Sequence, residues 1–419
     1  MDLVDGYFKR FGFRDAAISE VPSEALSMVV VIPCHDEPRL MESLESLWAC
    51  DRPLGAVEVI VVVNSAANSD PEVRDRNECT VREAGEWIGV HSEPGFRVHL
   101  LHHPDLPPRQ AGVGLARKIG MDEALRRLAR VGRLETGIVA GFDADCRCDP
   151  DYLCCLEAHF RDHPRTPGCS IRFEHPLSGP FDEAIYDAVA RYELHLRYYI
   201  EAMRHAGVPH AFHTVGSAMA VRAGVYARQG GMNRRQAGED FYFLHKVIPL
   251  GGYTELNQTR VIPSPRPSHR VPFGTGRAVS RHLAGGEPFR TYPLAAFRDL
   301  GGLFPRVDLF YAGAGPGTVS EAMRSFLEEQ RFVEAVGEMR RNSGGLGSFR
   351  NRFYRWFDGF RVMKFIHHAR DLYYGSAELA GESSALLDLL GGSRGGVEVR
   401  ELLGCYRERG RRIWLPGEG

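Results

Sequence analysis

The distribution of apolar residues predicts alternating strands and helices in the N-terminal part of the chain. Short β-branched runs at "MVVVIP" (28–33) and "VEVIVVVN" (57–64) are typical of buried strands. Between them, "MESLESLWAC" (41–50) places its leucines at helical spacing. A strand, a helix and a second strand in this order indicate a βαβ unit with parallel strands.

A third buried strand is predicted at "TGIVAGF" (136–142), after a helix over 111–132. These strands are continuously apolar rather than alternating, which indicates that helices cover both faces of the sheet. Ligands of an open α/β sheet bind at the carboxyl ends of its strands. We therefore expect the functional residues at that edge.

The pattern becomes helical further along the chain. A long helix is predicted over 181–206, and the strand signal fades after the loop "PSPRPSHRVPFGTGR" (263–277). We expect an N-terminal extension (1–26), an α/β domain (27–278) and a mainly helical C-terminal region (279–419).

Composition and charge exclude several classes of protein. The 419 residues are 43% hydrophobic and 25% charged, with a formal net charge of −2. A nucleic-acid-binding domain is normally strongly basic. The apolar runs fall far short of the roughly 20 residues of a membrane span, and the N-terminus lacks the apolar region of a signal peptide. We expect a cytoplasmic protein that binds no nucleic acid.

The nine cysteines argue against a disulfide framework, because their number is odd and the chain is large. The segment "CRCDPDYLCC" (146–155) contains no C-x-x-C pair, which argues against a zinc site. Free thiols are the expected state.

Two carboxylates, Asp143 and Asp145, follow the third predicted strand. In extended backbone they point to the same side, and like charges there repel unless a proton or a cation intervenes. The pair is either a solvated turn or a site for Mg²⁺ or Mn²⁺. Such ions take one or two carboxylates and complete their shell with phosphate oxygens.

A second acidic pair, Glu239 and Asp240, begins the apolar segment "EDFYFLHKV" (239–247). Acids in the first turn of a helix stabilise its dipole. The alternative is that a carboxylate acts as a general base beside an acceptor hydroxyl.

Three further motifs have structural and functional interpretations. The turn in "VIPCHDE" (31–37) either simply ends a strand or contacts a nucleotide. The G-x-G of "AGVGLARKIG" (111–120) is not preceded by the strand that a dinucleotide-binding fold requires. Arg117 and Lys118 are solvated charges or phosphate contacts. The loop 263–278 has prolines and glycines that fix its shape and basic residues that suit phosphate.

The order of these motifs resembles the family 2 glycosyltransferases and other enzymes with the GT-A fold. The series is "VVIPCHDE", "VVNS", "GVGLARKIG", "FDADC", "VGSAMAVRAGVYARQGGM", "AGEDFYF" and a later histidine, within residues 27–275. The resemblance implies an α/β mixed sheet flanked by helices, followed here by a mainly helical extension. It also implies a metal-dependent transferase that moves a hexosyl group from a nucleotide-diphospho-sugar to an acceptor hydroxyl.

The resemblance also implies roles for individual residues. Asp143 and Asp145 would bind Mn²⁺ or Mg²⁺, Asp240 would be the base, and Glu239 would orient the site or the acceptor. His269 is predicted as a third metal ligand, because two carboxylates and two phosphate oxygens leave an octahedral ion short of ligands. The expected donor contacts are Pro33, His35, Glu37, Asn64, Arg117, Asp143, Ala144, Arg270 and Arg277.

Two departures from the family pattern leave alternatives open. The second strand ends in Asn64-Ser65 where acids are usual, and Lys118 replaces the usual asparagine. A nucleotidyltransferase is one alternative, although "PCHDEPR" lacks the glycines expected after its first strand. A non-catalytic sugar-nucleotide-binding protein is another. The acceptor could be a glycan, a lipid-linked molecule or a small molecule.

The segment 351–374, "NRFYRWFDGFRVMKFIHHARDLYY", mixes aromatic and basic residues. It is either a membrane-surface helix that receives a lipid-linked acceptor or a helix that packs its aromatic side chains in a core.

Overall fold

The chain forms two compact units. The computed structural model describes residues 2–268, 274–285, 289–391 and 398–412. The first unit comprises Met1–Pro176 and Thr214–Arg277, and the second comprises Leu177–His213 and Ala278–Gly419. The chain thus crosses from one unit to the other after Pro176, after His213 and after Arg277.

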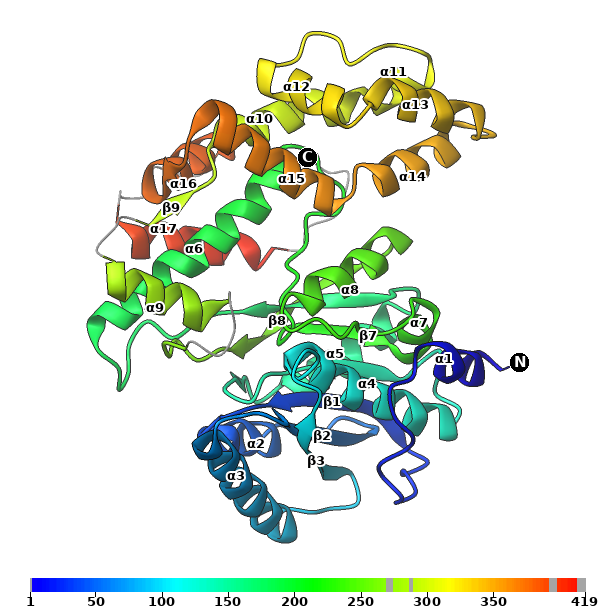
Figure 1. The fold of residues 1–419 in the computed structure, drawn as a ribbon, viewed down its shortest axis with the longest axis vertical. Helices are drawn as coiled ribbons and strands as arrows, with labels where there is room; N and C mark the ends of the chain where they lie inside the picture. Colours follow the sequence, from blue (N-terminus) through cyan, green and yellow to red (C-terminus); the bar gives the residue numbers. More distant parts are fainter. Residues whose placement is uncertain (1, 269–273, 286–288, 392–397, 413–419) are drawn as a thin grey trace. The chain divides into compact units, whose positions relative to one another are not determined.

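A mixed sheet of eight strands forms the first unit, in the order β3-β2-β1-β4-β7-β6-β8-β5 (Figure 1). The strands are β1 (Leu26–Cys34), β2 (Ala56–Ala66), β3 (Phe96–Leu106), β4 (Ile138–Gly141), β5 (Arg147–Cys148), β6 (Gly168–Phe173), β7 (Met219–Arg222) and β8 (Thr254–Ile262). Strand β1 runs parallel to β2 and β4, whereas β7 is antiparallel to β4 and β6. The predicted mixed α/β sheet is confirmed.

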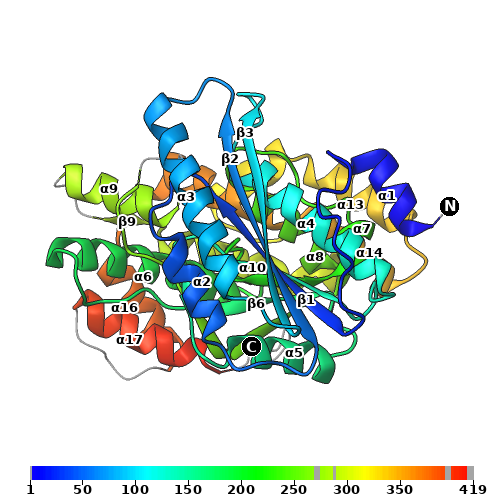
Figure 2. The same ribbon diagram turned by 90° about the horizontal axis from the view of Figure 1, so that it is seen from below.

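Helices cover both faces of this sheet. They are α1 (Leu3–Phe11), α2 (Leu40–Trp48), α3 (Pro71–Val90), α4 (Val113–Arg130), α5 (Tyr152–Asp162), α7 (Ala223–Arg228), α8 (Glu239–Val247) and η1 (Ile248–Leu250). Helices α2 and α3 lie on one face of the β1–β3 strands and α4 lies on the other (Figures 1 and 2). Strands β1 and β2 are accordingly buried along almost their whole length.

The register of the parallel strands brings their carboxyl ends to one edge. Val31 pairs with Ile60 of β2 and with Gly141 of β4, and its carbonyl accepts the N–H of Phe142 at 3.0 Å. Pro33 lies two residues further along β1, past the end of β4, so no ladder bond is lost there through its missing N–H. The residues that follow β1, β2 and β4 therefore share one edge.

The second unit is mainly helical, as predicted for its C-terminal part. Its helices are α6 (Glu183–His205), α10 (Leu294–Leu303), η2 (Phe304–Arg306), α11 (Val307–Tyr311), α12 (Glu321–Glu329), α13 (Phe332–Arg341), α14 (Leu346–Trp356), α15 (Gly359–Ala369), η3 (Arg370–Tyr374), α16 (Leu379–Leu389) and α17 (Val399–Gly410). Helix α9 (Thr275–Gly285) begins in the first unit and continues into the second. Strands β9 (Arg290–Thr291) and β10 (Ala377–Glu378) form a small antiparallel pair.

Three of the aromatic side chains of the 351–374 segment lie in the core of the second unit, and Tyr354 and Trp356 pack against it partly buried. Phe353, Phe357 and Phe365 are buried there together with Ile366, whereas Leu372 is exposed. This arrangement favours the packing interpretation of the segment. Among the described residues, no helix combines the length and the apolar character that crossing a membrane requires.

Candidate functional site

A buried arginine joins the two predicted acidic pairs. Arg117, near the start of α4, is 2% exposed. Its Nη2 donates to Oδ1 of Asp143 at 2.6 Å, and its Nη1 donates to Oε1 of Glu239. The strand end after β4 and the first turn of α8 therefore meet on one guanidinium. Arg117, predicted to contact the donor, is held between the two acids.

Gly216 permits this arrangement. A Cβ atom at position 216 would lie 2.4 Å from Nη1 of Arg117 and 2.8 Å from its Cζ, so any side chain there would displace the guanidinium. The N–H of Gly216 also donates to Oδ2 of Asp240 at 2.8 Å. Gly216 was not predicted as a site residue, although it lies within the "VGSAMAV" motif.

Asp240 is half-buried and firmly oriented. Besides the bond from Gly216, its Oδ1 accepts the N–H of Phe241 at 2.7 Å. Each carboxylate oxygen has a second lone pair, so these bonds leave Asp240 able to accept a proton.

Burial dominates the protonation of this cluster. It raises the pKa of Glu239 to about 7, with Arg117 opposing the rise and Asp240 adding to it. Burial also raises the pKa of Asp240, against the effect of Arg117 and the two backbone N–H groups. Burial lowers the pKa of Arg117, but Glu239 and Asp143 outweigh it and the net shift is upward. Glu239 and Asp240, both buried beside one guanidinium, thus bind protons more readily than free carboxylates do.

This cluster predicts a pH-dependent contribution to stability. The pKa of Glu239 is about 7 in the folded protein and 4.5 without the fold. A raised pKa gives stability that is present below about pH 4.5 and lost as the pH rises through 7. Glu239→Gln keeps the shape without this titration, so the variant should gain stability relative to wild type as the pH rises from 4.5 to 7. Urea unfolding at several pH values measures the difference.

The exposed Glu45 provides a matched control. We expect Glu45→Gln to follow the wild-type pH dependence over the same range. Parallel curves for Glu239→Gln and wild type would contradict the assigned titration.

A second arginine, Arg266, lies near Asp145, the other member of the Asp143–Asp145 pair. Its Nη2 lies 2.5 Å from Oε2 of the buried Glu37 and 4.0 Å from Oδ2 of Asp145. Glu37 also accepts the N–H of Arg39 at 3.0 Å. Arg266 belongs to the basic loop 263–278, and its position between Glu37 and Asp145 was not predicted.

The ends of β1 and β2 are joined through Asn64. Its carbonyl oxygen lies 2.7 Å from Nδ1 of His35 and accepts from Nδ2 of Asn77 at 3.3 Å. Oδ1 of Asn77 accepts the N–H of Asp36 at 2.9 Å. Asp36 has a φ of 51°, a left-handed conformation that aspartate tolerates better than most residues. Asn77 was not predicted.

For the remaining predicted site residues, only their location in the chain and in the fold can be given. Ala144 is buried between the two aspartates in sequence, and Arg277 lies in the first turn of α9. His269 and Arg270 lie outside the described residues, so the predicted third metal ligand stays a prediction.

The Asp pair has the chemistry of a site for a hard cation. The side chains of Asp143 and Asp145 are 39% and 27% exposed, so solvent reaches both carboxylates. Within the described ranges, no three His, Cys, Asp or Glu side chains are grouped to hold a metal ion. Two carboxylates suffice for Mg²⁺ or Mn²⁺ when phosphate oxygens supply the other ligands.

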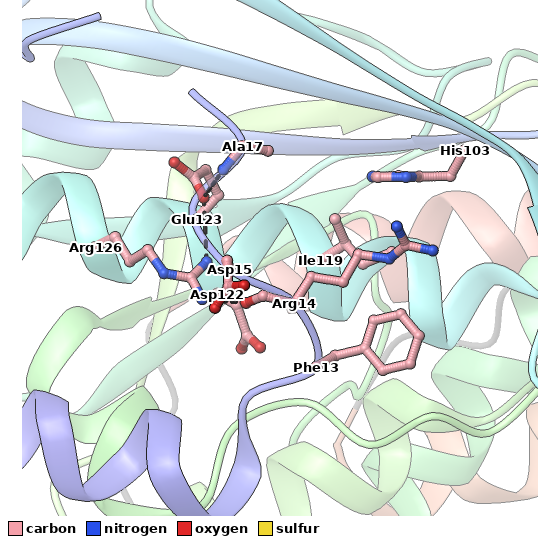
Figure 3. Close-up of a pocket in the computed structure, with 9 residues that line it drawn as sticks. All are labelled: Phe13, Arg14, Asp15, Ala17, His103, Ile119, Asp122, Glu123 and Arg126. Carbon is pink, nitrogen blue, oxygen red and sulfur yellow. Dashed lines mark hydrogen bonds and ion pairs between the residues drawn. The ribbon is translucent and has the colours of Figure 1, made fainter. Parts of the chain in front are cut away.

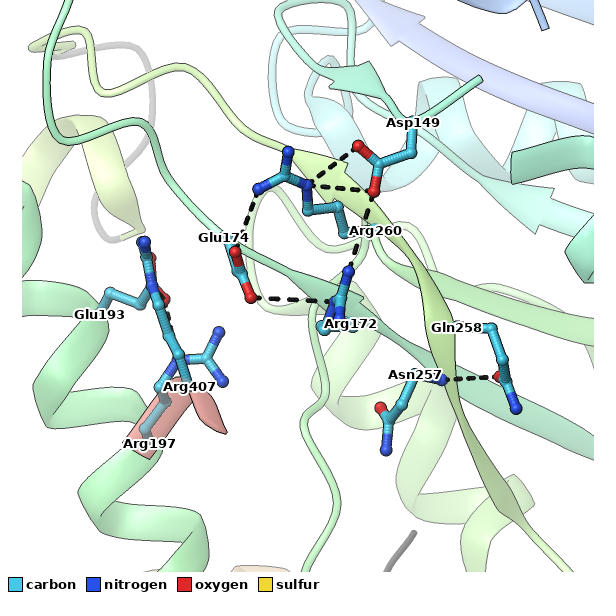
Figure 4. A network of polar contacts seen from close by, with 9 residues as sticks. All are labelled: Asp149, Arg172, Glu174, Glu193, Arg197, Asn257, Gln258, Arg260 and Arg407. Carbon is cyan, nitrogen blue, oxygen red and sulfur yellow. Dashed lines mark hydrogen bonds and ion pairs between the residues drawn. The ribbon is translucent and has the colours of Figure 1, made fainter. Parts of the chain in front are cut away.

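An ionic network fixes the chain just after the Asp pair (Figure 4). Nε of Arg260, on β8, donates to Oδ1 of Asp149 at 3.0 Å, and its Nη1 donates to Oε2 of Glu174 at 3.1 Å. Nη2 of Arg172 lies 3.8 Å from Oδ2 of Asp149. The backbone N–H of Asp149 donates to the Arg260 carbonyl at 3.1 Å. The segment that carries Asp143 and Asp145 is therefore anchored to β8.

A small cavity of about 20 Å³ lies beside α4, under the segment that follows α1 (Figure 3). Phe13, Ile119 and His103 are among its lining residues, and Glu123 accepts the N–H of Ala17 at 3.2 Å. A volume of this size holds about one water molecule, so the cavity does not suit a sugar nucleotide.

Comparison with solved structures finds proteins bound to nucleotides or nucleotide sugars. S. aureus TarS 1–349 with UDP-GlcNAc matches at 13% identity and a TM-score of 0.40, covering 88% of this chain and 93% of that chain. GalNAc-T7 with UDP, GalNAc and Mn²⁺ matches at 15% and 0.36, covering 75% and 57%. The mannosyltransferase PcManGT from Pyrobaculum calidifontis, with GDP-Man and Mn²⁺, matches at 16% and 0.34, covering 88% and 94%.

No protein-family model matches the chain, and no curated protein matches it. The inference about this chain's chemistry rests on its own residues.

Proposed function

We propose that the protein is a metal-dependent glycosyltransferase that uses a nucleotide-diphospho-sugar donor. The observation that carries the proposal is the contact of Arg117 with both Asp143 and Glu239. This contact links the pair Asp143 and Asp145, which suits a cation, to the pair Glu239 and Asp240, which suits a general base. The link lies at the edge of the sheet where ligands bind. The order of the motifs along the chain supports the same activity.

The donor side of the site is proposed at the ends of β1, β2 and β4. Asp143 and Asp145 would hold Mn²⁺ or Mg²⁺, which offsets the negative charge that develops on a departing diphosphate. Pro33, His35 and Asn64, at the ends of β1 and β2, are proposed contacts of the base or ribose. Arg270 and Arg277 are proposed phosphate contacts, and His269 a further metal ligand.

Asp240 is the proposed general base. Its carboxylate would accept the proton of the acceptor hydroxyl as that oxygen attacks the anomeric carbon. The N–H groups of Gly216 and Phe241 hold the carboxylate in one orientation. Arg117 is a proposed positioning residue, because it contacts Asp143 and Glu239, and Glu239 is proposed to orient the site or the acceptor.

The Asp pair provides the test of this function. Asp145→Asn keeps the shape of the side chain and removes its charge, so Mn²⁺-dependent donor binding should weaken at least tenfold while the fold persists. Binding is measured by calorimetry with a panel of UDP- and GDP-sugars, with Mn²⁺ and with EDTA. Slow hydrolysis of the bound donor reports catalysis.

Asp162→Asn is the matched control, because Asp162 is exposed at the end of α5 and its ion pair is with the neighbouring Arg161. It should bind the donor as wild type does. The metal-dependent assignment would be contradicted if wild type and Asp145→Asn bound the donor equally well and if EDTA did not change that affinity. Tight binding without any turnover would favour a non-catalytic sugar-nucleotide-binding protein.

A further inference from the structure

Two cysteines that the proposed chemistry does not use face each other in the first unit. Sγ of Cys50 lies 3.5 Å from Sγ of Cys148, although the two residues are 98 positions apart in the sequence. Cys50 follows the end of α2 and is 4% exposed, whereas Cys148, on β5, is partly exposed. All nine cysteines are free thiols in the structure.

Hydrogen bonds already hold the two backbone segments together. Oγ of Ser46 accepts the N–H of Cys148 at 2.9 Å, and Oγ of Ser43 donates to the carbonyl of Cys146 at 2.7 Å. The N–H of Asp51 donates to the carbonyl of Pro150 at 2.8 Å. A disulfide bond is about 2.05 Å long, so the sulfur atoms need to approach by only about 1.5 Å.

Their surroundings shift the pKa values of the two thiols in opposite directions. The hydrogen bond from Cys148 lowers the pKa of Cys50, and Arg52 adds to this effect against the effect of burial. The same contact and burial raise the pKa of Cys148. The thiolate is the reactive form of cysteine, so these effects, with Arg52 nearby, favour Cys50 as the nucleophile of the pair.

We propose that Cys50 and Cys148 are a redox-modification site that forms a reversible disulfide on exposure to hydrogen peroxide. The Cys50 thiolate attacks one peroxide oxygen, the O–O bond breaks, and the released hydroxide takes up a proton to become water. Cys148 then attacks the sulfenic acid sulfur, an S–S bond forms and a second water leaves. In total, two thiols lose two electrons and two protons, and one peroxide becomes two water molecules.

The disulfide would act on the segment that carries the Asp pair. Cys148 is three residues after Asp145, and β5 pairs with β8 through Cys148 and Val261. Cross-linking this segment to the end of α2 restricts the unfolded chain. Oxidation should therefore raise the melting temperature of the full chain by several degrees, and a phosphine reductant should reverse the rise.

Peptide mapping of the native full-length protein tests the site without reference to any enzymatic activity. The protein is treated with hydrogen peroxide, alkylated under denaturing conditions and digested without reductant. We expect a linked pair of peptides containing Cys50 and Cys148, two hydrogens lighter than their sum. A dominant link between other cysteines, or recovery of both thiols in alkylated form, would overturn the proposal.

Two variants sharpen the result. Cys148→Ser should abolish both the linked peptides and the shift in melting temperature, whereas Cys79→Ser, which removes an exposed thiol elsewhere, should retain them. A peroxide-induced shift that persists in Cys148→Ser would also overturn the proposal. Peptide mapping of the wild-type protein still tests the proposal if a variant folds poorly.

Discussion

Asp240→Asn should lower turnover by about 10²–10⁴, the usual scale for the loss of a general base. Asparagine has almost the same shape but accepts no proton at neutral pH. Donor affinity should stay at the wild-type value, because Asp240 is assigned to the acceptor. Single-turnover transfer or donor hydrolysis measures the rate, and calorimetry measures the affinity.

The hydrogen bonds of Asp240 supply an internal check on this variant. Its two oxygens accept the N–H groups of Gly216 and Phe241, and the asparagine amide can accept only one of them. The variant should therefore also lose about 1–3 kcal/mol of stability, the cost of one unpaired buried donor. Asp162→Asn should change neither the rate nor the stability. Wild-type turnover in Asp240→Asn would place the base elsewhere.

Arg117→Met should destabilise the protein by about 3–5 kcal/mol at neutral pH, the scale for breaking a buried ion pair. The methionine fills much of the space but leaves Asp143 and the buried Glu239 without their shared cation. The pKa of Glu239, already raised, should rise further in the folded variant. The loss of stability should therefore shrink at acidic pH, where Glu239 is protonated in both proteins.

Urea unfolding at pH 5 and pH 8 separates charge from packing in this variant. The exposed Arg109→Met provides the control and should cost little at either pH. An equal loss for Arg117→Met at both pH values would mean that Arg117 contributes by packing rather than by charge.

The sheet could be predicted where local sequence decides the structure. Strands β1, β2 and β4 are short apolar runs, buried on both faces, and they were predicted within a few residues. The helix predicted over 181–206 is α6, Glu183–His205. Strand β3 was not predicted, because its "FRVHLLHHPDL" interrupts the apolar pattern with three histidines. Helix α3 was not predicted either, since few of its residues are buried.

The site could be predicted only in part, because its contacts join distant segments. The acidic pairs stood out as motifs, but no local pattern shows that Arg266 meets Glu37, which is 229 residues away. Similarly, an arginine near the start of a helix is normally exposed. Arg117 is buried with acids that follow β4 and begin α8, and those acids lie 26 and 122 residues further along the chain.

The crossings of the chain between the two units have a consequence for its synthesis. Helix α6 is made before β7, the strand that lies between β4 and β6 at the middle of the sheet. The apolar face of α6, with Leu194 and Tyr198, packs in a core with residues of α10 and α17, such as Phe297 and Leu403. At 5–20 residues per second, a ribosome needs roughly 10–40 s to travel from the end of α6 to α17. Until α10 is made, the apolar face of α6 has neither of these partners, and until α17 is made it lacks the second; a chain truncated after Arg277 would lack both permanently.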